Sequence, residues 1–218
     1  MANYTITSIK TGKQTEVQFE YLSKLTDELD ELHTSKKKLS ESDIYKMTLW
    51  KVDRYPFIDD EKIKGINSLA TIKTFDEDAK TKTIDVLKAL LNTNGIGLPM
   101  ASTYLRFVNP KVYQIIDVRA FRAAYDYVLQ DKGYVYVQHD TQIEVYLNYL
   151  DQLHKIANDK NGYHGYSVAF ENLDRFLYDF DKFVGYKLSD NPQMTTKEIE
   201  KKLKDFIAKQ KERNKGGK

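Results

Sequence analysis

Apolar residues recur at helical spacing along most of the chain. Leu22, Leu25, Leu29 and Leu32 lie three or four positions apart, which is the apolar stripe of an amphipathic helix. The same spacing predicts further helices at 44–50, 84–91, 101–108, 117–129, 143–153, 170–180 and 199–207. Only residues 4–9 alternate at period two, and 133–137 read as extended or irregular. The pattern therefore predicts an all-α protein with a minor extended element.

Polar residues, prolines and caps divide these helices. Ser40 or Ser42 is expected to cap the second helix and Ser167 the helix at 170–180, while residues 59–80 read as a polar stretch. Residues 187–194 resemble a linker in composition. We therefore expect a main domain over 1–186, built around a helical hairpin at 84–108, followed by the linker and a basic C-terminal helix over 187–218.

Composition excludes several kinds of chemistry. The 218 residues contain no Cys, which rules out disulfides, thiolate nucleophiles, thiolate zinc sites and a Cys-ligated iron–sulfur cluster. The four His residues are scattered and form no metal-ligand pattern, so no metal site is predicted. The apolar runs are too short to span a membrane, and the start lacks a signal-peptide pattern. We therefore expect a cytoplasmic protein that does not enter a membrane.

Positive charge is concentrated in two places although the net charge is only +2. Residues 95–122 carry four basic residues against one acid, and residues 197–218 carry nine against four. The C-terminal run could follow DNA electrostatically, but such a run is more often a solvated end.

The basic segment at 95–122 contains the one sharp motif of the chain. Gly95-Ile96-Gly97 joins two predicted helices, and Pro99 fits the first turn of the second helix. Glycines allow a sharp turn and close approach of a phosphate to free backbone N–H groups at a helix start. A Gly-x-Gly hairpin that serves only helix packing is the alternative.

A second part of the motif follows at a characteristic distance. Ile116-Asp117-Val118-Arg119-Ala120-Phe121-Arg122 places an acid eighteen residues after Pro99 and a base five residues after the acid. Together with the hairpin and Ala101, this pattern resembles the helix-hairpin-helix DNA glycosylase superfamily over roughly residues 80–130. The resemblance implies a helical glycosylase-like fold and double-stranded DNA as the partner.

The resemblance also implies roles for single residues. Asp117 would be the catalytic carboxylate, which stabilises an oxocarbenium-like transition state. A purely structural role as helix N-cap is the alternative for Asp117, and both roles can hold together. Gly95, Ile96 and Gly97 would bind DNA phosphate. Arg119 and Arg122 could also reach phosphate, with a solvated face or an ion pair as their alternative.

This chain departs from the family pattern at the hairpin. Pro99 stands where bifunctional members carry a Schiff-base lysine, so a monofunctional hydrolase is expected. Thr93-Asn94 replaces the family's Leu-Pro, which weakens the apolar anchor of the hairpin. No cofactor is expected. The resemblance implies at most a structural monovalent cation at the hairpin carbonyls near Leu91, Thr93 and Ile96.

A base-flipping enzyme needs an aromatic pocket for the extruded base. Trp50, Tyr104 and Tyr113 are candidates for its walls, although core packing is the alternative for each of them. The sequence therefore favours a monofunctional glycosylase that hydrolyses the N-glycosidic bond of a modified base. Two alternatives stay open: a non-catalytic helix-hairpin-helix DNA-binding protein, and a helical interaction or scaffold protein.

Overall fold

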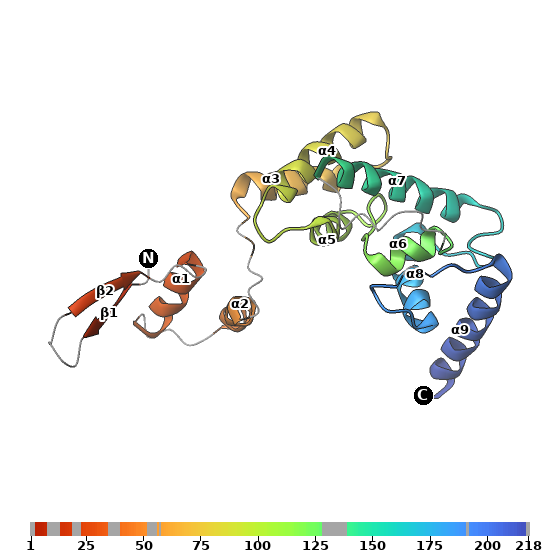
Figure 1. Cartoon of the computed structure of the whole chain (residues 1–218). Helices are drawn as coiled ribbons and strands as arrows, with labels where there is room; N and C mark the ends of the chain where they lie inside the picture. Colours follow the sequence, from red (N-terminus) through yellow and green to blue (C-terminus); the bar gives the residue numbers. More distant parts are fainter. Residues whose placement is uncertain are drawn as a thin grey trace. The chain divides into compact units, whose positions relative to one another are not determined.

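The fold is described from a computed structural model, shown in Figure 1. It describes residues 3–7, 14–18, 23–34, 40–51, 56, 58–127, 139–190 and 192–216. The chain forms two compact units, Met1–Phe57 and Ile58–Lys218. Most of the described residues are helical, which confirms the predicted all-α class.

The first unit contains a hairpin and two helices. Strand β1 (Asn3–Thr7) pairs antiparallel with β2 (Gln14–Gln18), with Asn3 opposite Gln18. This is the predicted minor extended element, with a second strand that the alternation at 4–9 did not indicate. Helices α1 (Ser23–Thr34) and α2 (Glu41–Lys51) follow. Of the two serines proposed as the cap of α2, Ser40 takes the position: its Oγ accepts the N–H of Asp43 at 3.2 Å.

In the described part of the second unit, all the regular elements that the structure names are helices. Its elements are α3 (Asp60–Ser68), the 3₁₀ turn η1 (Leu69–Thr71), α4 (Glu77–Leu91), α5 (Leu98–Val108), α6 (Val118–Ala124), α7 (His139–Asn158), α8 (Phe170–Val184) and α9 (Thr196–Gly216). Helix α6 packs mainly against α8, and α4 packs against α7 (Figure 1). The residues at 133–137, expected to be extended, lie outside the described part.

Aspartate caps start three of these helices. The side chains of Asp59, Asp76 and Asp117 each accept the backbone N–H of the residue three positions later, at 2.9, 2.9 and 2.7 Å. Each cap satisfies one of the N–H groups that a helix start leaves without an intrahelical partner. The predicted cap Ser167 is wrong, because the N-cap of α8 is Ala169, which provides no side-chain hydrogen bond.

Helix α3 lies inside the stretch at 59–80 that the sequence analysis described only as polar. Only two of its side chains are bulky and apolar: Ile66 is buried, whereas Ile63 remains 44% exposed. Its Gly65 lies where an added Cβ would contact Val86 of α4 at 3.5 Å. The Asp59 cap and this close approach to α4 therefore support a helix whose own apolar stripe is weak.

Helix α9 belongs to the same unit as the helices before it. Phe206 is buried and meets the rings of Phe176, Phe180 and Phe183 of α8 at centroid distances of 6.0, 5.9 and 5.5 Å. The division of the chain therefore falls at residue 57 and not at the expected boundary at 186. Within the described residues, no helix combines the length and the apolar character needed to cross a bilayer.

Candidate functional site

The two glycines form the expected tight connection between α4 and α5. The Thr93 N–H donates to the Leu90 carbonyl at 2.9 Å, and the Ile96 N–H donates to the Thr93 carbonyl at 3.1 Å. Gly95 has φ +84°, a left-handed conformation that suits glycine. Gly97 is the N-cap of α5 and supplies no side-chain hydrogen bond to the helix start. The structure therefore contains a helix, a glycine hairpin and a second helix at the predicted place.

The predicted phosphate contacts at this hairpin differ in accessibility. A shallow hollow lined by residues 91–97 faces outward, and a Cβ added at Gly95 would meet no atom within 4 Å. Ile96, in contrast, is 5% exposed and its N–H is already bonded to Thr93. Gly95 and Gly97 are therefore open to a ligand, whereas Ile96 anchors the turn.

Carbonyl groups of the hairpin were the expected ligands of a monovalent cation. The Thr93 carbonyl already accepts the Ile96 N–H. Over the described part of the chain, no group of three or more His, Asp or Glu side chains is arranged to hold a metal ion. The cation at Leu91, Thr93 and Ile96 stays a prediction.

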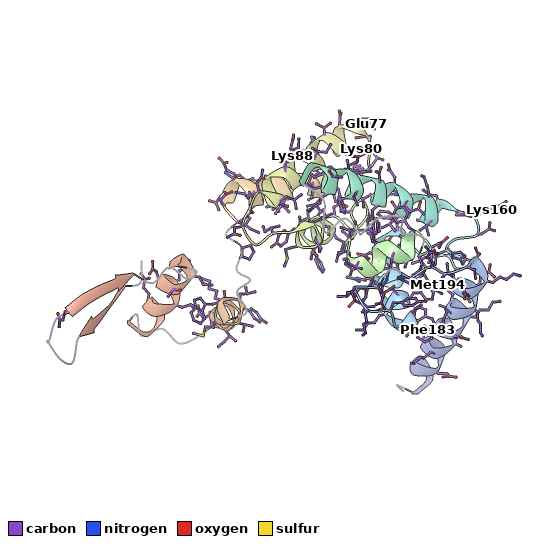
Figure 2. All side chains as sticks on the ribbon, in the orientation of Figure 1. Glu77, Lys80, Lys88, Lys160, Phe183 and Met194 are labelled. Atoms are coloured by element: carbon purple, nitrogen blue, oxygen red, sulfur yellow. The ribbon has the colours of Figure 1, made fainter. Side chains whose placement is uncertain are left out.

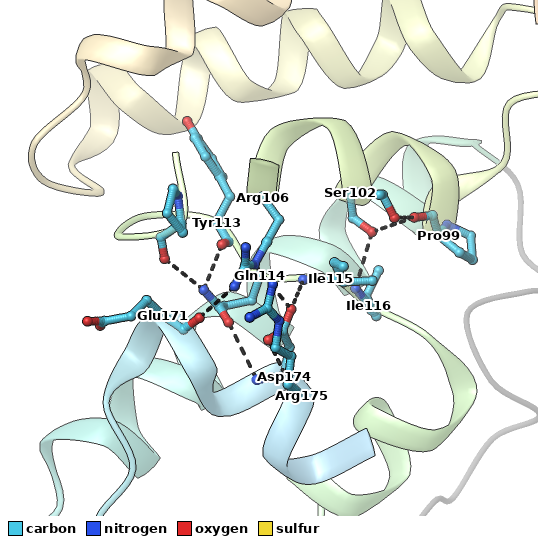
Figure 3. Close-up of polar contacts among 12 residues, drawn as sticks. Pro99, Ser102, Arg106, Tyr113, Gln114, Ile115, Ile116, Glu171, Asp174 and Arg175 are labelled. Carbon is cyan, nitrogen blue, oxygen red and sulfur yellow. Dashed lines mark hydrogen bonds and ion pairs between the residues drawn. The ribbon is translucent and has the colours of Figure 1, made fainter. Parts of the chain in front are cut away.

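Asp117 is placed at the start of α6 by an extended segment. The side chains of Ser102 and Asp174 accept the N–H groups of Ile116 and Ile115, at 3.2 and 3.0 Å respectively (Figure 3). Ser102 comes from α5, directly after the hairpin, and Asp174 comes from α8. Two helices therefore hold the backbone immediately before Asp117.

The carbonyl groups of the same segment are held from a third helix. Tyr146 and Tyr149 of α7 donate their hydroxyls to the carbonyls of Gln114 and Ile115, both at 3.0 Å. Buried backbone outside regular structure needs such partners, because an unpaired N–H or C=O costs free energy. This set of side-chain contacts fixes the path of the chain that leads to Asp117.

A cavity of about 320 Å³ opens beside Asp117. Its walls combine apolar and charged side chains from the 115–120 segment and from α8: Ile115, Asp117, Ala120, Asp174, Arg175, Tyr178 and Asp179. The volume falls in the range of small-molecule sites, roughly 300–1,000 Å³. Asp117 is thus a helix cap that also lines a cavity.

The surroundings of Asp117 act on its pKa in opposite directions. Burial raises the pKa of the Asp117 carboxyl, because the charged form loses hydration. The N–H groups of Ala120 and Arg119 oppose this shift, and the nearby negative charge of Asp181 adds to it. The net effect is a raised pKa, which is a common property of functional carboxyls but also of buried structural ones.

The phosphate role predicted for Arg122 is wrong. Its guanidinium is fully buried and binds both carboxylate oxygens of Asp181, at 2.5 and 2.8 Å. It also donates to the carbonyls of Tyr186, Lys187 and Asp190. The Nε, Nη1 and Nη2 atoms of Arg122 all donate hydrogen bonds within the protein, which matches the ion-pair alternative.

Arg119 takes part in the same network. Its Nη1 donates to Asp181 Oδ2 at 2.9 Å and to the Tyr186 carbonyl at 3.2 Å. The side chain keeps 19% of its surface exposed. Arg119 therefore supports the attachment of α6 to α8, which matches the ion-pair alternative, and its contact with phosphate stays a prediction.

The three predicted pocket aromatics do not line the cavity beside Asp117. Trp50 lies in the first unit, where its Nε1 donates to Thr26 Oγ1 at 2.9 Å. Tyr113 is fully buried and its hydroxyl is 2.8 Å from Thr83 Oγ1. Tyr104 is partly buried on α5, and burial raises the pKa of its hydroxyl. The core-packing alternative is correct for Tyr113.

Tyr178 is an aromatic residue that does line the cavity. The sequence interpretation did not name it as a candidate. It stands on the polar side of α8, between Arg175 and Asp179, whereas the apolar stripe used to predict the helix faces the core. Its signal was available as an aromatic residue among charged ones.

Comparison with family models, with curated proteins and with solved structures finds no match for this chain.

Proposed function

We propose that this chain is a monofunctional DNA glycosylase of the helix-hairpin-helix type, with Asp117 as its catalytic carboxylate. The observation that carries the proposal is that Asp117 lines a cavity of about 320 Å³ and is held there from α5, α7 and α8. The order of elements supports it: a helix, a glycine hairpin, a second helix, and an aspartate that opens a third.

The proposed reaction replaces the base on C1′ by water. The bond from C1′ to the base nitrogen breaks, and the base leaves with the electron pair and takes up a proton. Positive charge develops on the sugar, and the Asp117 carboxylate stabilises it. Water then bonds to C1′ and gives up its proton, so that free base and an abasic sugar are the products.

The hairpin favours simple hydrolysis over a lyase step. Pro99 has no amine that could form a Schiff base, and it lies in the first turn of α5. Gly95 and Gly97 at the open hollow would contact phosphate through their backbone. Such contacts position a duplex without reading its sequence.

The test measures free bases released from duplex DNA that carries alkylated, oxidised and deaminated lesions, by mass spectrometry. Wild type is compared with Asp117→Asn and with a matched variant, Asp76→Asn. Asp76 caps α4 with the same geometry, accepting the Ala79 N–H at 2.9 Å, but it does not line the cavity. We expect release by wild type and by Asp76→Asn, and loss in Asp117→Asn.

Three other results would overturn the proposal. Equal release by wild type and Asp117→Asn would remove Asp117 from the chemistry. Salt-dependent duplex binding without release of any base would indicate the non-catalytic DNA-binding protein. Neither binding nor release would indicate the interaction or scaffold protein.

A further inference from the structure

The outward side of α8 combines two cations and an aromatic ring beside the cavity. Arg175, Tyr178 and Lys182 are exposed and lie three and four positions apart, so they follow one line along the helix. The opposite side of α8 is buried through Leu173 and Leu177. The helix is therefore fixed to the core while this line of side chains faces outward.

The Arg175 guanidinium has no hydrogen-bond or ion-pair partner in the described part of the chain, although the Arg175 N–H donates to Asp174 Oδ1. Although Asp174 and Asp179 flank it, its guanidinium forms no hydrogen bond or ion pair with any residue that the structure describes. The Asp174 carboxylate is directed inward, where it accepts the Ile115 N–H and lies 3.9 Å from Arg106 Nε. Among the residues that the structure describes, Arg175 is thus a cation without a counter-charge on the wall of the cavity that Asp117 also lines.

Tyr178 and Lys182 continue the same surface. Tyr178 is 36% exposed and lines the cavity, and the ammonium group of Lys182 lies 5.9 Å from the centre of its ring. An exposed aromatic ring gives a nucleobase a surface for stacking, and flanking cations attract the phosphates.

We propose, building on the function proposed above, that the α8 surface formed by Arg175, Tyr178 and Lys182 binds the DNA strand whose base enters the cavity. Arg175 and Lys182 contact phosphates, and Tyr178 stacks on a base at the cavity mouth. The two cations are seven residues apart, about 10 Å along the helix. Successive phosphates of one strand are separated by about 3.4 Å along the axis of a duplex. The two cations therefore reach different phosphates.

One carboxylate works against this contact. Asp179 is exposed on the cavity wall next to the proposed strand path. Its negative charge repels phosphate, so its removal is expected to strengthen binding. The sign of this effect distinguishes a phosphate path along α8 from a path elsewhere on the protein.

The test uses the full chain and a duplex oligonucleotide with one unpaired nucleotide, with the fully paired duplex as reference. Dissociation constants are measured by fluorescence anisotropy between about 50 and 200 mM salt. Arg175→Gln and Lys182→Gln are each expected to reduce the slope of log Kd against log salt by about 0.9. Lys160→Gln, an exposed lysine of the loop between α7 and α8, is the matched control and leaves the slope unchanged (Figure 2).

Two further variants complete the test. Tyr178→Ala is expected to weaken binding of the unpaired duplex by about 5- to 150-fold without changing the salt slope, as loss of one stacking contact does. Asp179→Asn is expected to tighten binding. All these side chains are exposed or at the cavity wall, so the variants retain the fold.

The outcomes separate this inference from the proposed function. Wild-type slopes in Arg175→Gln and Lys182→Gln, with base release intact, would overturn the α8 contact alone. An equal reduction of the salt slope in Lys160→Gln would also overturn the α8 contact, because any exposed lysine would then have the same effect. The expected slope changes without any base release would uphold the contact and reject the glycosylase. A wild-type chain that neither binds nor releases would reject both.

Discussion

Arg122 and Asp181 form a bidentate ion pair in which neither side chain is exposed to solvent. The pair joins α6 to α8 across 59 residues of sequence. The same two helices supply the walls of the cavity beside Asp117. This buried pair is therefore part of the framework that holds the candidate site together.

Removing one charge of this pair should destabilise the fold strongly. Asp181→Asn leaves the Arg122 guanidinium buried without its anion, a change that typically costs about 3–5 kcal/mol. The exposed Asp179, two residues earlier on the same helix, gives the matched variant Asp179→Asn, which should change stability by at most about 0.5 kcal/mol. Urea unfolding followed by circular dichroism measures both. Equal midpoints for the two variants would show that the pair adds nothing to stability.

The Ser102 hydroxyl should contribute more to the stability of the fold than the hydroxyl of its neighbour Thr103. Both hydroxyls donate to the Pro99 carbonyl, at 3.0 and 2.7 Å, but only Ser102 also accepts the buried N–H of Ile116. Ser102→Ala should cost about 1–3 kcal/mol, because this N–H is left unpaired. Thr103→Ala should cost clearly less. Amide exchange of Ile116 provides a local readout, and unchanged exchange in Ser102→Ala would contradict the assigned bond.

Asp117→Asn should not destabilise the protein at neutral pH. Burial raises the pKa of Asp117, so the folded state binds the proton more tightly than the unfolded state does. This group therefore lowers stability as pH rises from its unfolded pKa through its folded pKa. Asparagine keeps a capping oxygen without the charge.

We expect urea midpoints of Asp117→Asn at or above those of wild type at pH 7, with the difference shrinking in acid. A large loss of stability at pH 7 would contradict this and would also weaken any conclusion from lost activity.

His164 should make stability depend on pH in the same direction as Asp117, because its pKa is also raised in the folded state. Its ring Nε2 lies 2.8 Å from Asp126 Oδ1, and this hydrogen bond raises the pKa of His164 above 6.5, with the negative charge of Glu200 also contributing. The stabilisation is fully present below the unfolded pKa and is lost as pH rises through the folded pKa.

His164→Asn removes the pair but suits the local backbone, because asparagine tolerates the φ of +47° found there. The gap in unfolding free energy between wild type and variant should be widest below the unfolded pKa of histidine, about 6.5, and should narrow as pH rises through the folded pKa of His164. A gap independent of pH would mean that the pair does not titrate as inferred.

Two glycines of the loop between α7 and α8 should respond differently to alanine. Gly162 and Gly165 have φ +61° and +91°. A Cβ at Gly162 would lie 2.3 Å from the Tyr166 carbonyl oxygen, whereas at Gly165 it would meet no atom within 4 Å. Gly165→Ala should cost about 1–2 kcal/mol for the left-handed backbone alone. Gly162→Ala should cost more, and thermal unfolding would show a lower Tm. Equal Tm values would contradict the close approach.

Most helices of this protein could be predicted from the local sequence. Apolar residues at steps of three and four predicted α1, α4, α5, α7, α8 and α9, because burial of one stripe requires that spacing. The glycine hairpin and the Asp117 cap were also visible, since each depends on a few consecutive residues. Helix α3 was missed because its single buried isoleucine, Ile66, leaves no stripe to detect.

The composition of the candidate site was decided by tertiary structure. Asp174 reaches Ile115 across 59 residues, and Arg122 reaches Asp181 across the same separation. No local pattern reveals that an arginine beside Asp117 will be buried and paired, or that Tyr178 and Arg175 will line the cavity. Whether a charged side chain faces solvent or an ion-pair partner depends on which helices pack together, and that choice is made by the whole core at once.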